Sequence, residues 1–171
     1  MTNKVLEAIK YADLKHKGQK RRVTNEDYIE HPLKVSYLLM SYKSSHAMED
    51  LLCAALLHDV IEDTNAKVSD ILSKFGPRVL GLVCELTNDD AMIEKLGKLE
   101  YHKKKLVGLS SWALTIKLVD RLANITDNPS EKMKKETKEL IEHLKSKRVL
   151  TKTQNKICDN ILGELWKQFM H

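Results

Sequence analysis

The sequence is poor in the residues that mark turns, disulfides and membrane spans. It has six glycines and three prolines in 171 residues, which argues against a turn-rich all-β fold. Its three cysteines are odd in number and form no Cys-x-x-Cys pair, so nothing indicates a disulfide framework. No apolar run approaches the roughly 18 residues that a membrane span needs. These absences predict a cytoplasmic protein without disulfides, in which Cys53 and Cys84, both within apolar runs, are buried and reduced.

Aromatic residues and excess charge are also scarce. Aromatic side chains make up 5% of the chain, so the sequence offers no platform for stacking nucleic-acid bases. The 29 basic and 24 acidic side chains leave a net charge of +5. This excess suits a small anionic ligand such as a nucleotide and is too small to indicate nucleic-acid binding.

Apolar residues instead recur at helical spacing along nearly the whole chain, and no useful stretch alternates like a strand. The pattern predicts an all-α fold of about eight to ten helices in a single domain, residues 1–171. Residues 91–108 are rich in lysine and are predicted as either a helix or an ordered basic loop. The other expected helices are one that ends near Gly18, one that begins at His31-Pro32, one from about Ala47 into His58, and Val68–Lys74, Val79–Leu86, Ser110–Thr126, Glu131–Lys147 and Thr151–Gln168.

The most informative segment is Leu56–Asp63, in which a histidine and three carboxylates follow an apolar stripe. If the segment is helical, His58, Asp59, Glu62 and Asp63 project from adjoining faces at one helix end. Three carboxylates this close repel one another unless a cation or a raised pKa relieves them. A histidine beside an aspartate at the end of an apolar core is typical of metal ligands. The alternative interpretation is a surface pair of acids at a helix end.

A second acidic position lies on the expected helix 110–126. Asp120 and Asn124 are four residues apart on a face that otherwise carries apolar side chains, so Asp120 should point inward and need a partner or a metal. The alternative is a surface ion pair of Asp120 with Lys117 or Arg121. A third candidate is His31, whereas the other histidines are expected to be structural or exposed: His16, His46, His102, His143 and His171.

Together, His31, His58-Asp59 and Asp120 resemble the signature of the HD-domain metal phosphohydrolases. Further segments resemble the hydrolase domain of the RelA/SpoT family, especially stand-alone members such as the metazoan SpoT homologue. No synthetase or regulatory domain follows them, so a single free-standing HD hydrolase domain is expected. The segments are Ala12–Arg22, Tyr28–Pro32, Ala54–Thr64, Phe75-Gly76 and Lys117–Asn124.

The resemblance implies a Mn²⁺-dependent removal of the 3′-pyrophosphate from ppGpp or pppGpp. His31, His58, Asp59 and Asp120 match its metal ligands. Two imidazoles and two carboxylates suit Mn²⁺ or Fe²⁺ better than a thiolate-rich zinc site would. The resemblance implies one Mn²⁺ ion, with Fe²⁺ or Zn²⁺ less expected. Glu62 and Asp63 would form the catalytic acidic pair, and one of them should have a raised pKa. The substrate-binding residues implied are Arg21 and Arg22 near the base, Asn124 and Asp127 near the nucleoside, Lys95 near a phosphate, and Lys135 in place of a family arginine in the later helix.

Two departures affect the loop that carries Arg21. Asp27 stands where the family commonly has proline, and the turn Val23–Asp27 lacks the usual glycine. Other substrates therefore remain open, namely ppApp or the 2′-phosphate of NADPH, as does a non-catalytic nucleotide sensor or antitoxin. The expected partner is a small nucleotide, with no nucleic acid and no membrane, and a homo-oligomer stays open. The lysines of the segments 98–105 and 132–147 are expected to form solvated surface.

Overall fold

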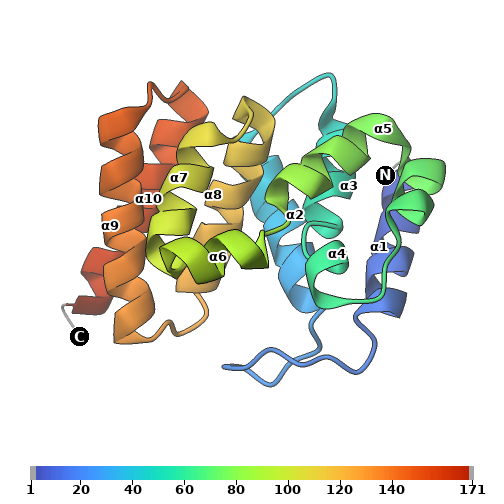
Figure 1. Cartoon of the computed structure of the whole chain (residues 1–171), viewed down its shortest axis with the longest axis horizontal. Helices are drawn as coiled ribbons and strands as arrows, with labels where there is room; N and C mark the ends of the chain where they lie inside the picture. The colour runs from blue at the N-terminus through green and yellow to red at the C-terminus, as the bar shows by residue number, and fades with distance from the viewer. Residues whose placement is uncertain (1–2, 170–171) are drawn as a thin grey trace. The chain divides into compact units, whose positions relative to one another are not determined.

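The computed structural model describes residues 3–169, and this part of the chain contains ten α-helices (Figure 1). The described residues form no strand, and one isolated β-bridge joins Lys20 and Asp27. The all-α prediction is therefore confirmed, with ten helices; His171 lies outside the described residues. The helices are α1 (Asn3–Lys15), α2 (Glu30–Tyr42), α3 (Met48–Leu56), α4 (Val60–Asp63), α5 (Val68–Leu86), α6 (Asp90–Leu96), α7 (Lys98–Gly108), α8 (Ser111–Ile125), α9 (Glu131–Lys147) and α10 (Lys152–Phe169).

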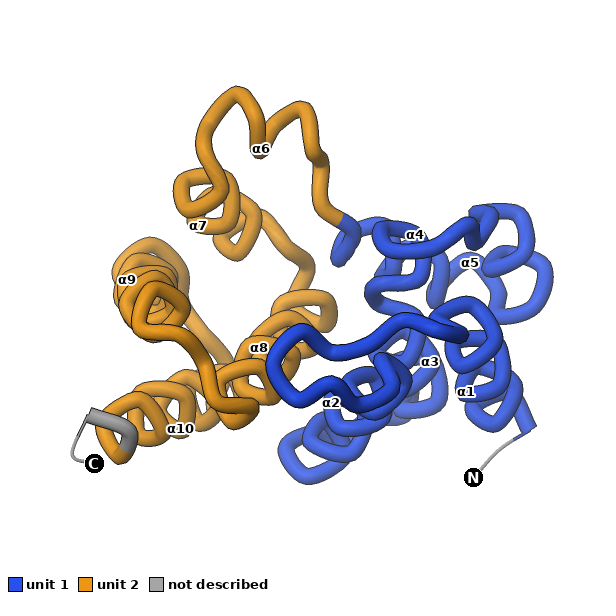
Figure 2. Tube along the Cα trace, turned by 90° about the horizontal axis from the view of Figure 1, so that it is seen from below, with its two compact units in different colours: residues 1–87 blue, residues 88–171 orange. Residues whose placement is uncertain are grey.

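The chain divides into two compact units (Figure 2), and each unit is described by itself. The first unit, residues 1–87, holds α1 to α5, and the second unit, residues 88–171, holds α6 to α10. The expectation of one domain over residues 1–171 thus remains a prediction. None of the described helices is long and apolar enough to cross a membrane.

In the first unit, α3 lies at the centre and packs against α1, α2 and α5. Its Leu51 and Ala54 are fully buried together with Val35 and Leu39 of α2. Helix α5 contains a kink, because Gly76 adopts a φ of +84° and Pro77 starts the next turn. A left-handed φ is strained for any residue with a side chain, so glycine fixes the break. The two short helices predicted on either side of this position are therefore confirmed.

The helix predicted to run from about Ala47 into His58 ends earlier than expected. Helix α3 stops at Leu56, and α4 begins only at Val60, so residues 57–59 form a turn. His58 Nδ1 lies 2.8 Å from the carbonyl oxygen of Ala55, which a continuous helix would pair with the backbone N–H of Asp59. The side chain of His58 takes that acceptor, and the Asp59 backbone lies in the bridge region at φ −105° and ψ −4°.

In the second unit, α8 is the central helix and packs against α9 and α10. Residues 91–108, for which a helix or a loop was predicted, form α6 and α7, separated by Gly97 at a φ of +78°. Side-chain caps fix three helix starts: Asp89 accepts from Met92 N, and the hydroxyls of Ser110 and Ser130 accept from backbone amides three residues later. These caps explain why the predicted starts of α8 and α9 agree closely with the structure.

The expected burial of the cysteines is confirmed for Cys53 and is wrong for Cys84, which is exposed. Cys84 follows Leu82 and Val83 on α5, and these two neighbours are the side chains that enter the core. A helix turns about 100° per residue, so an apolar run as long as Val79–Cys84 must place some of its members on the outer face. The described cysteines are all free thiols.

Candidate metal centre

Two buried histidines of the first unit face each other. His31 is the second residue of α2 and is 2% exposed, and His58 in the turn after α3 is 1% exposed. Their ring centroids are 5.3 Å apart with the planes at 62°. His31 is held at the start of α2 by its backbone N–H, which donates to the carbonyl of Tyr28 at 3.0 Å. The structure therefore brings together the two imidazoles that the sequence predicted as ligands.

The chemistry around His58 fits a divalent cation. Its Nδ1 must donate to the Ala55 carbonyl at 2.8 Å, because a carbonyl only accepts. In the neutral ring, Nε2 then presents a lone pair, and it lies 2.8 Å from Oδ2 of Asp59. Two acceptors at this distance repel unless a cation lies between them or the imidazole is charged. A backbone partner that orients a histidine so that its other nitrogen faces outward is typical of metal-binding histidines.

A tyrosine joins the ligand candidate Asp59 to the acidic residue Asp63. The Tyr28 hydroxyl donates to Asp59 Oδ2 at 2.7 Å and lies 3.1 Å from Asp63 Oδ2. Burial and the two carboxylates raise the pKa of Tyr28 far above its usual range, so the phenol remains a neutral donor. The predicted rise is found for Asp63: lost hydration and the charge of Asp59 raise its pKa, while the Tyr28 hydrogen bond opposes them.

His16 and Gln19 support Tyr28 on the side of its ring, and neither was predicted as a site residue. His16 is 2% exposed and stacks on Tyr28 with the ring centroids 4.5 Å apart. Its Nδ1 is 2.7 Å from Gln19 Oε1, and Gln19 Nε2 donates to the backbone carbonyl of Asp63 at 2.7 Å. Tyr28 was not predicted as part of the site, although its position three residues before His31 is a signal that could have placed it there.

The loop that carries Arg21 closes without glycine or proline. Asn25 adopts a φ of +60°, a conformation that asparagine tolerates better than most residues. Asp27, at the position of the usual proline, forms an ion pair with Lys20 at 2.9 Å. The backbone N–H of Arg21 donates to Glu26 at 2.9 Å, and its guanidinium lies 5.9 Å from the Tyr28 ring centroid. Both departures from the family pattern therefore fall in a closed turn that keeps the Arg21 guanidinium beside the Tyr28 ring.

In the second unit, Asp120 is buried on α8, as its inward-facing position predicted, with 6% exposure. Asn124 Nδ2 donates to its Oδ1 at 2.7 Å, and Lys117 Nζ lies 3.0 Å from its Oδ2. The alternative partner Lys117 thus does pair with Asp120, but inside the protein instead of at the surface. This arrangement orients a buried carboxylate of the kind that binds a divalent cation.

The remaining predicted residues lie at or near the surface, as Asp63 does. In the first unit, Arg22, Glu62 and Asp63 are exposed, and Glu62 lies beside Asp63 on α4. In the second unit, Lys95 on α6 and Lys135 on α9 are exposed, and Asp127 is half-buried just after α8. The lysines of α9 alternate with acidic residues, as in the pair of Lys138 and Glu142 at 3.9 Å, whose exposed side chains agree with a solvated face. The Lys134 side chain is an exception, because it is 12% exposed and pairs with Glu131 at 2.6 Å.

The chain matches the family model of the HD domain over residues 8–149. It is 41% identical over 125 residues to the guanosine-3′,5′-bis(diphosphate) 3′-pyrophosphohydrolase MESH1 of Drosophila melanogaster, covering 72% of this chain and 69% of the relative. It is 35% identical over 140 residues to a guanosine-3′,5′-bis(diphosphate) 3′-pyrophosphohydrolase of Aquifex aeolicus, covering 79% of this chain and 20% of that protein.

A solved structure extends the similarity to the whole fold. It is that of a metazoan orthologue of SpoT, described as hydrolysing ppGpp and as having a role in starvation responses, and it superposes with a TM-score of 0.79 at 29% identity. The match covers 99% of this chain and 97% of that one. The chain belongs to the HD-domain family, in the branch that contains MESH1 and the SpoT-related proteins.

Proposed function

We propose that the chain is a Mn²⁺-dependent hydrolase that converts guanosine 3′,5′-bis(diphosphate) to GDP and pyrophosphate. The observation that carries the proposal is the cluster of His31, His58, Asp59 and Asp63 in the first unit, with a histidine nitrogen facing a carboxylate at 2.8 Å. The MESH1 and SpoT-related relatives, which bear the name of this activity, support the choice of substrate.

Four side chains would hold the ion in this proposal: His31, His58, Asp59 and Asp120. His31, His58 and Asp120 are buried, and each offers one atom suited to a divalent cation. The match of all four to the HD signature supports their grouping around one ion, and on the same ground we propose that residues 1–171 form a single HD domain. When bound, Mn²⁺ supplies electrostatic stabilisation of the phosphoryl oxygens and acidifies water.

In this proposal, the carboxylates of Glu62 and Asp63 accept the proton that the attacking water loses. Water attacks the phosphorus attached to the ribose 3′ oxygen, the bond between that phosphorus and the 3′ oxygen breaks, and the 3′ oxygen takes up a proton. A carboxylate beside the reacting water is suited to accept its proton, and the raised pKa of Asp63 brings this group nearer to neutral pH. The Tyr28 hydroxyl, which lies 2.7 Å from Asp59 Oδ2 and 3.1 Å from Asp63 Oδ2, holds these acids in position.

The nucleotide is bound by side chains that match the family positions. Arg21 stacks on the guanine, with Arg22 beside it, and Asn124 and Asp127 contact the nucleoside. Lys95 and Lys135 neutralise phosphates. The orientation of Arg21 toward the Tyr28 ring at 5.9 Å supports its part in this arrangement. We also propose that the protein acts in the cytoplasm on this small nucleotide, because its described cysteines are free.

The proposal is tested by turnover of ppGpp with Mn²⁺, with GDP and pyrophosphate both quantified. We expect Glu62→Gln and Asp63→Asn to lower kcat by at least about 100-fold, the usual contribution of a general base. Glu7→Gln, which changes an exposed glutamate of α1 in the same way, should leave kcat unchanged. Wild-type protein that releases no pyrophosphate with Mn²⁺ would refute the activity, and unchanged turnover in both acidic variants would refute the mechanism.

The same assay on ppApp and NADPH measures the choice of substrate. We expect ppGpp to have the highest kcat/KM, because Arg21 is held over Tyr28 toward the candidate site despite the altered turn. Higher kcat/KM with ppApp or NADPH would reassign the substrate while leaving the hydrolase in place. Binding of nucleotide with no turnover of any of the three would favour the non-catalytic sensor.

A further inference from the structure

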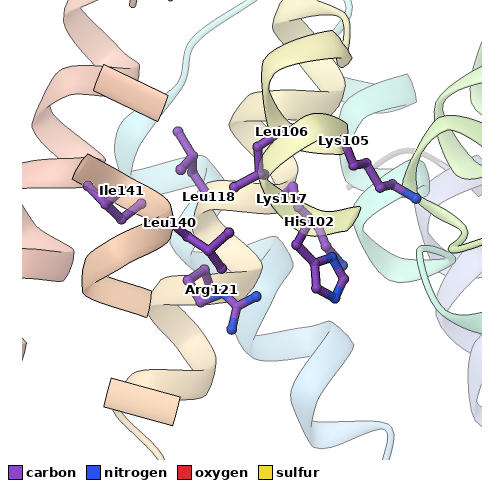
Figure 3. A pocket seen from close by; sticks show the side chains of 8 residues that line it. All are labelled: His102, Lys105, Leu106, Lys117, Leu118, Arg121, Leu140 and Ile141. Atoms are coloured by element: carbon purple, nitrogen blue, oxygen red, sulfur yellow. The ribbon is translucent and has the colours of Figure 1, made fainter. Parts of the chain in front are cut away.

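The second unit contains a small hollow among α7, α8 and α9 (Figure 3). Its floor is apolar and comes from Leu106, Leu118 and Leu140, which are 7%, 1% and 2% exposed. The enclosed space measures about 10 Å³, which is about the room that one water molecule or one anionic oxygen needs. A larger group therefore enters with one atom only and leaves its remainder at the mouth.

Basic side chains surround this apolar floor. Lys105 of α7 and Lys117 and Arg121 of α8 line the hollow together with His102. Lys105 Nζ is 3.3 Å from two neutral oxygens, those of the Asn88 side chain and the Tyr101 hydroxyl. These contacts orient the ammonium group.

The two cations of α8 differ in their partners. Lys117 is paired with Asp120 at 3.0 Å. Among the described residues, no carboxylate and no hydrogen-bond acceptor is found for the Arg121 guanidinium. A guanidinium beside an apolar surface lacks part of its hydration, and an oxyanion offers the bidentate partner that its geometry favours.

The pKa of His102 reflects its burial and the positive charges around the hollow. It is 8% exposed, and burial lowers the pKa of its imidazole to about 4, helped by the positive charges of Arg121, Lys117, Lys98 and Lys105. At neutral pH the ring is therefore uncharged and has one N–H to donate. A buried neutral donor next to several cations is a favourable environment for an anion.

We propose that this hollow binds a phosphate-type oxyanion, with Arg121 as its main partner and His102 and Lys105 as further donors. A tetrahedral oxyanion suits the site because one oxygen fills the small space while the others face the guanidinium and the ammonium groups at the mouth. The ligand is either a free ion, such as phosphate or pyrophosphate, or a phosphoryl group carried by a nucleoside. This inference goes beyond the proposed hydrolase activity and does not rest on it.

Nuclear magnetic resonance of the metal-free protein at pH 7 tests the proposal. The imidazole signals are followed during addition of sodium phosphate, pyrophosphate or GDP, against sodium chloride at the same ionic strength. His102→Gln removes one set of signals and so assigns the ring. We expect the phosphate-type ions to shift the His102 signals with saturation and chloride to leave them in place. Saturation by the inorganic ions identifies a free oxyanion, and saturation by GDP alone identifies a phosphoryl group on a nucleoside.

Two charge-matched variants separate a built site from general attraction. Arg121→Gln should weaken binding at least about tenfold, the effect of losing one charge-assisted hydrogen bond. Lys132→Gln removes an exposed cation of α9, whose side chain is 84% accessible, and should change affinity less than twofold. If Arg121→Gln lowers the melting temperature, the variant Lys105→Gln is used instead, and we expect it to lower the affinity for the oxyanion several-fold. The proposal would be overturned if Lys132→Gln lowered the oxyanion affinity as much as Arg121→Gln or Lys105→Gln does. It would also be overturned if none of the three ligands shifted the His102 signals with saturation.

Discussion

Removal of one oxygen atom tests how the acidic cluster is held. The change Tyr28→Phe deletes the hydroxyl that donates to Asp59 at 2.7 Å and lies 3.1 Å from Asp63. The ring remains, so its stack on His16 at 4.5 Å and its contact with His31 at 6.0 Å are kept. The variant therefore separates the hydrogen bonds of the tyrosine from its packing.

The size of the effect follows from the number of protons available. One hydroxyl has one proton, so the two carboxylates share a single charge-assisted hydrogen bond, which contributes about 1.5–3 kcal/mol. A loss of about 2 kcal/mol in a chain of this length lowers the melting temperature of metal-free protein by about 4–8 °C. Loss of a hydrogen bond that orients a metal ligand weakens metal affinity by about 10- to 100-fold, because Asp59 no longer has a fixed direction.

Two measurements follow from this reasoning. Thermal unfolding of the metal-free variant measures the loss of folding stability, and the Mn²⁺ concentration for half-maximal turnover measures the loss of metal affinity. Tyr37→Phe is the matched control, because Tyr37 is 69% exposed on the neighbouring turns of α2 and should show neither effect. If Tyr28→Phe requires the same Mn²⁺ concentration as wild type within twofold, the hydroxyl does not position Asp59 and the reasoning is refuted.

Three other features give predictions that are independent of the activity. Thr137 is fully buried and its hydroxyl has no hydrogen-bond partner among the described residues, so Thr137→Val should raise stability by about 1 kcal/mol, seen as a melting temperature about 2–4 °C higher. His102 has a folded pKa lowered to about 4 from 6.5, so the unfolded chain binds more protons between these values, and stability falls as the pH falls through that window. The slope is about 1.4 kcal/mol per pH unit for this one group, and denaturant titrations at pH 7 and 5 should show a smaller loss in His102→Phe. Burial raises the pKa of Cys53 to about 12 and that of Cys158 to about 11, whereas Cys84 is exposed. A thiol reagent at pH 8 should therefore modify one cysteine in the native protein and three after unfolding. Rapid modification of all three cysteines in the native protein would contradict the buried positions of Cys53 and Cys158.

Most of the fold was predictable because helical periodicity and helix caps are local. The start of α8 follows from a serine whose hydroxyl accepts from an amide three residues later, and the same is true of α9. The kink at Gly76 was predictable because glycine followed by proline marks a break. The exposure of Cys84 was not predictable in the same way, because an apolar run does not reveal which of its members faces outward.

The histidines and carboxylates of the first unit could be proposed from the sequence, because their residue types suit a metal ion. The side chains that hold them in place could not be proposed in the same way. Tyr28 and His16 meet because the loop between α1 and α2 folds back with Asn25 in a left-handed conformation. Gln19 reaches the backbone of Asp63 across 44 positions of sequence. Contacts of this kind depend on tertiary packing, and a spacing rule for one helix cannot contain them.

The turn after α3 shows why the helical interpretation of the acidic segment was wrong and its chemical conclusion was nevertheless useful. Adjacent residues on a continuous helix point about 100° apart, so His58 and Asp59 could not approach one ion together. The break at residues 57–59 brings His58 Nε2 and Asp59 Oδ2 to within 2.8 Å. The same histidine contributes to the break, since its Nδ1 donates to the carbonyl of Ala55, which a continuous helix would pair with the backbone N–H of Asp59. In this chain, the histidine and the aspartate that follow the apolar helix therefore form a donor pair through the interruption of the helix and not through its continuation.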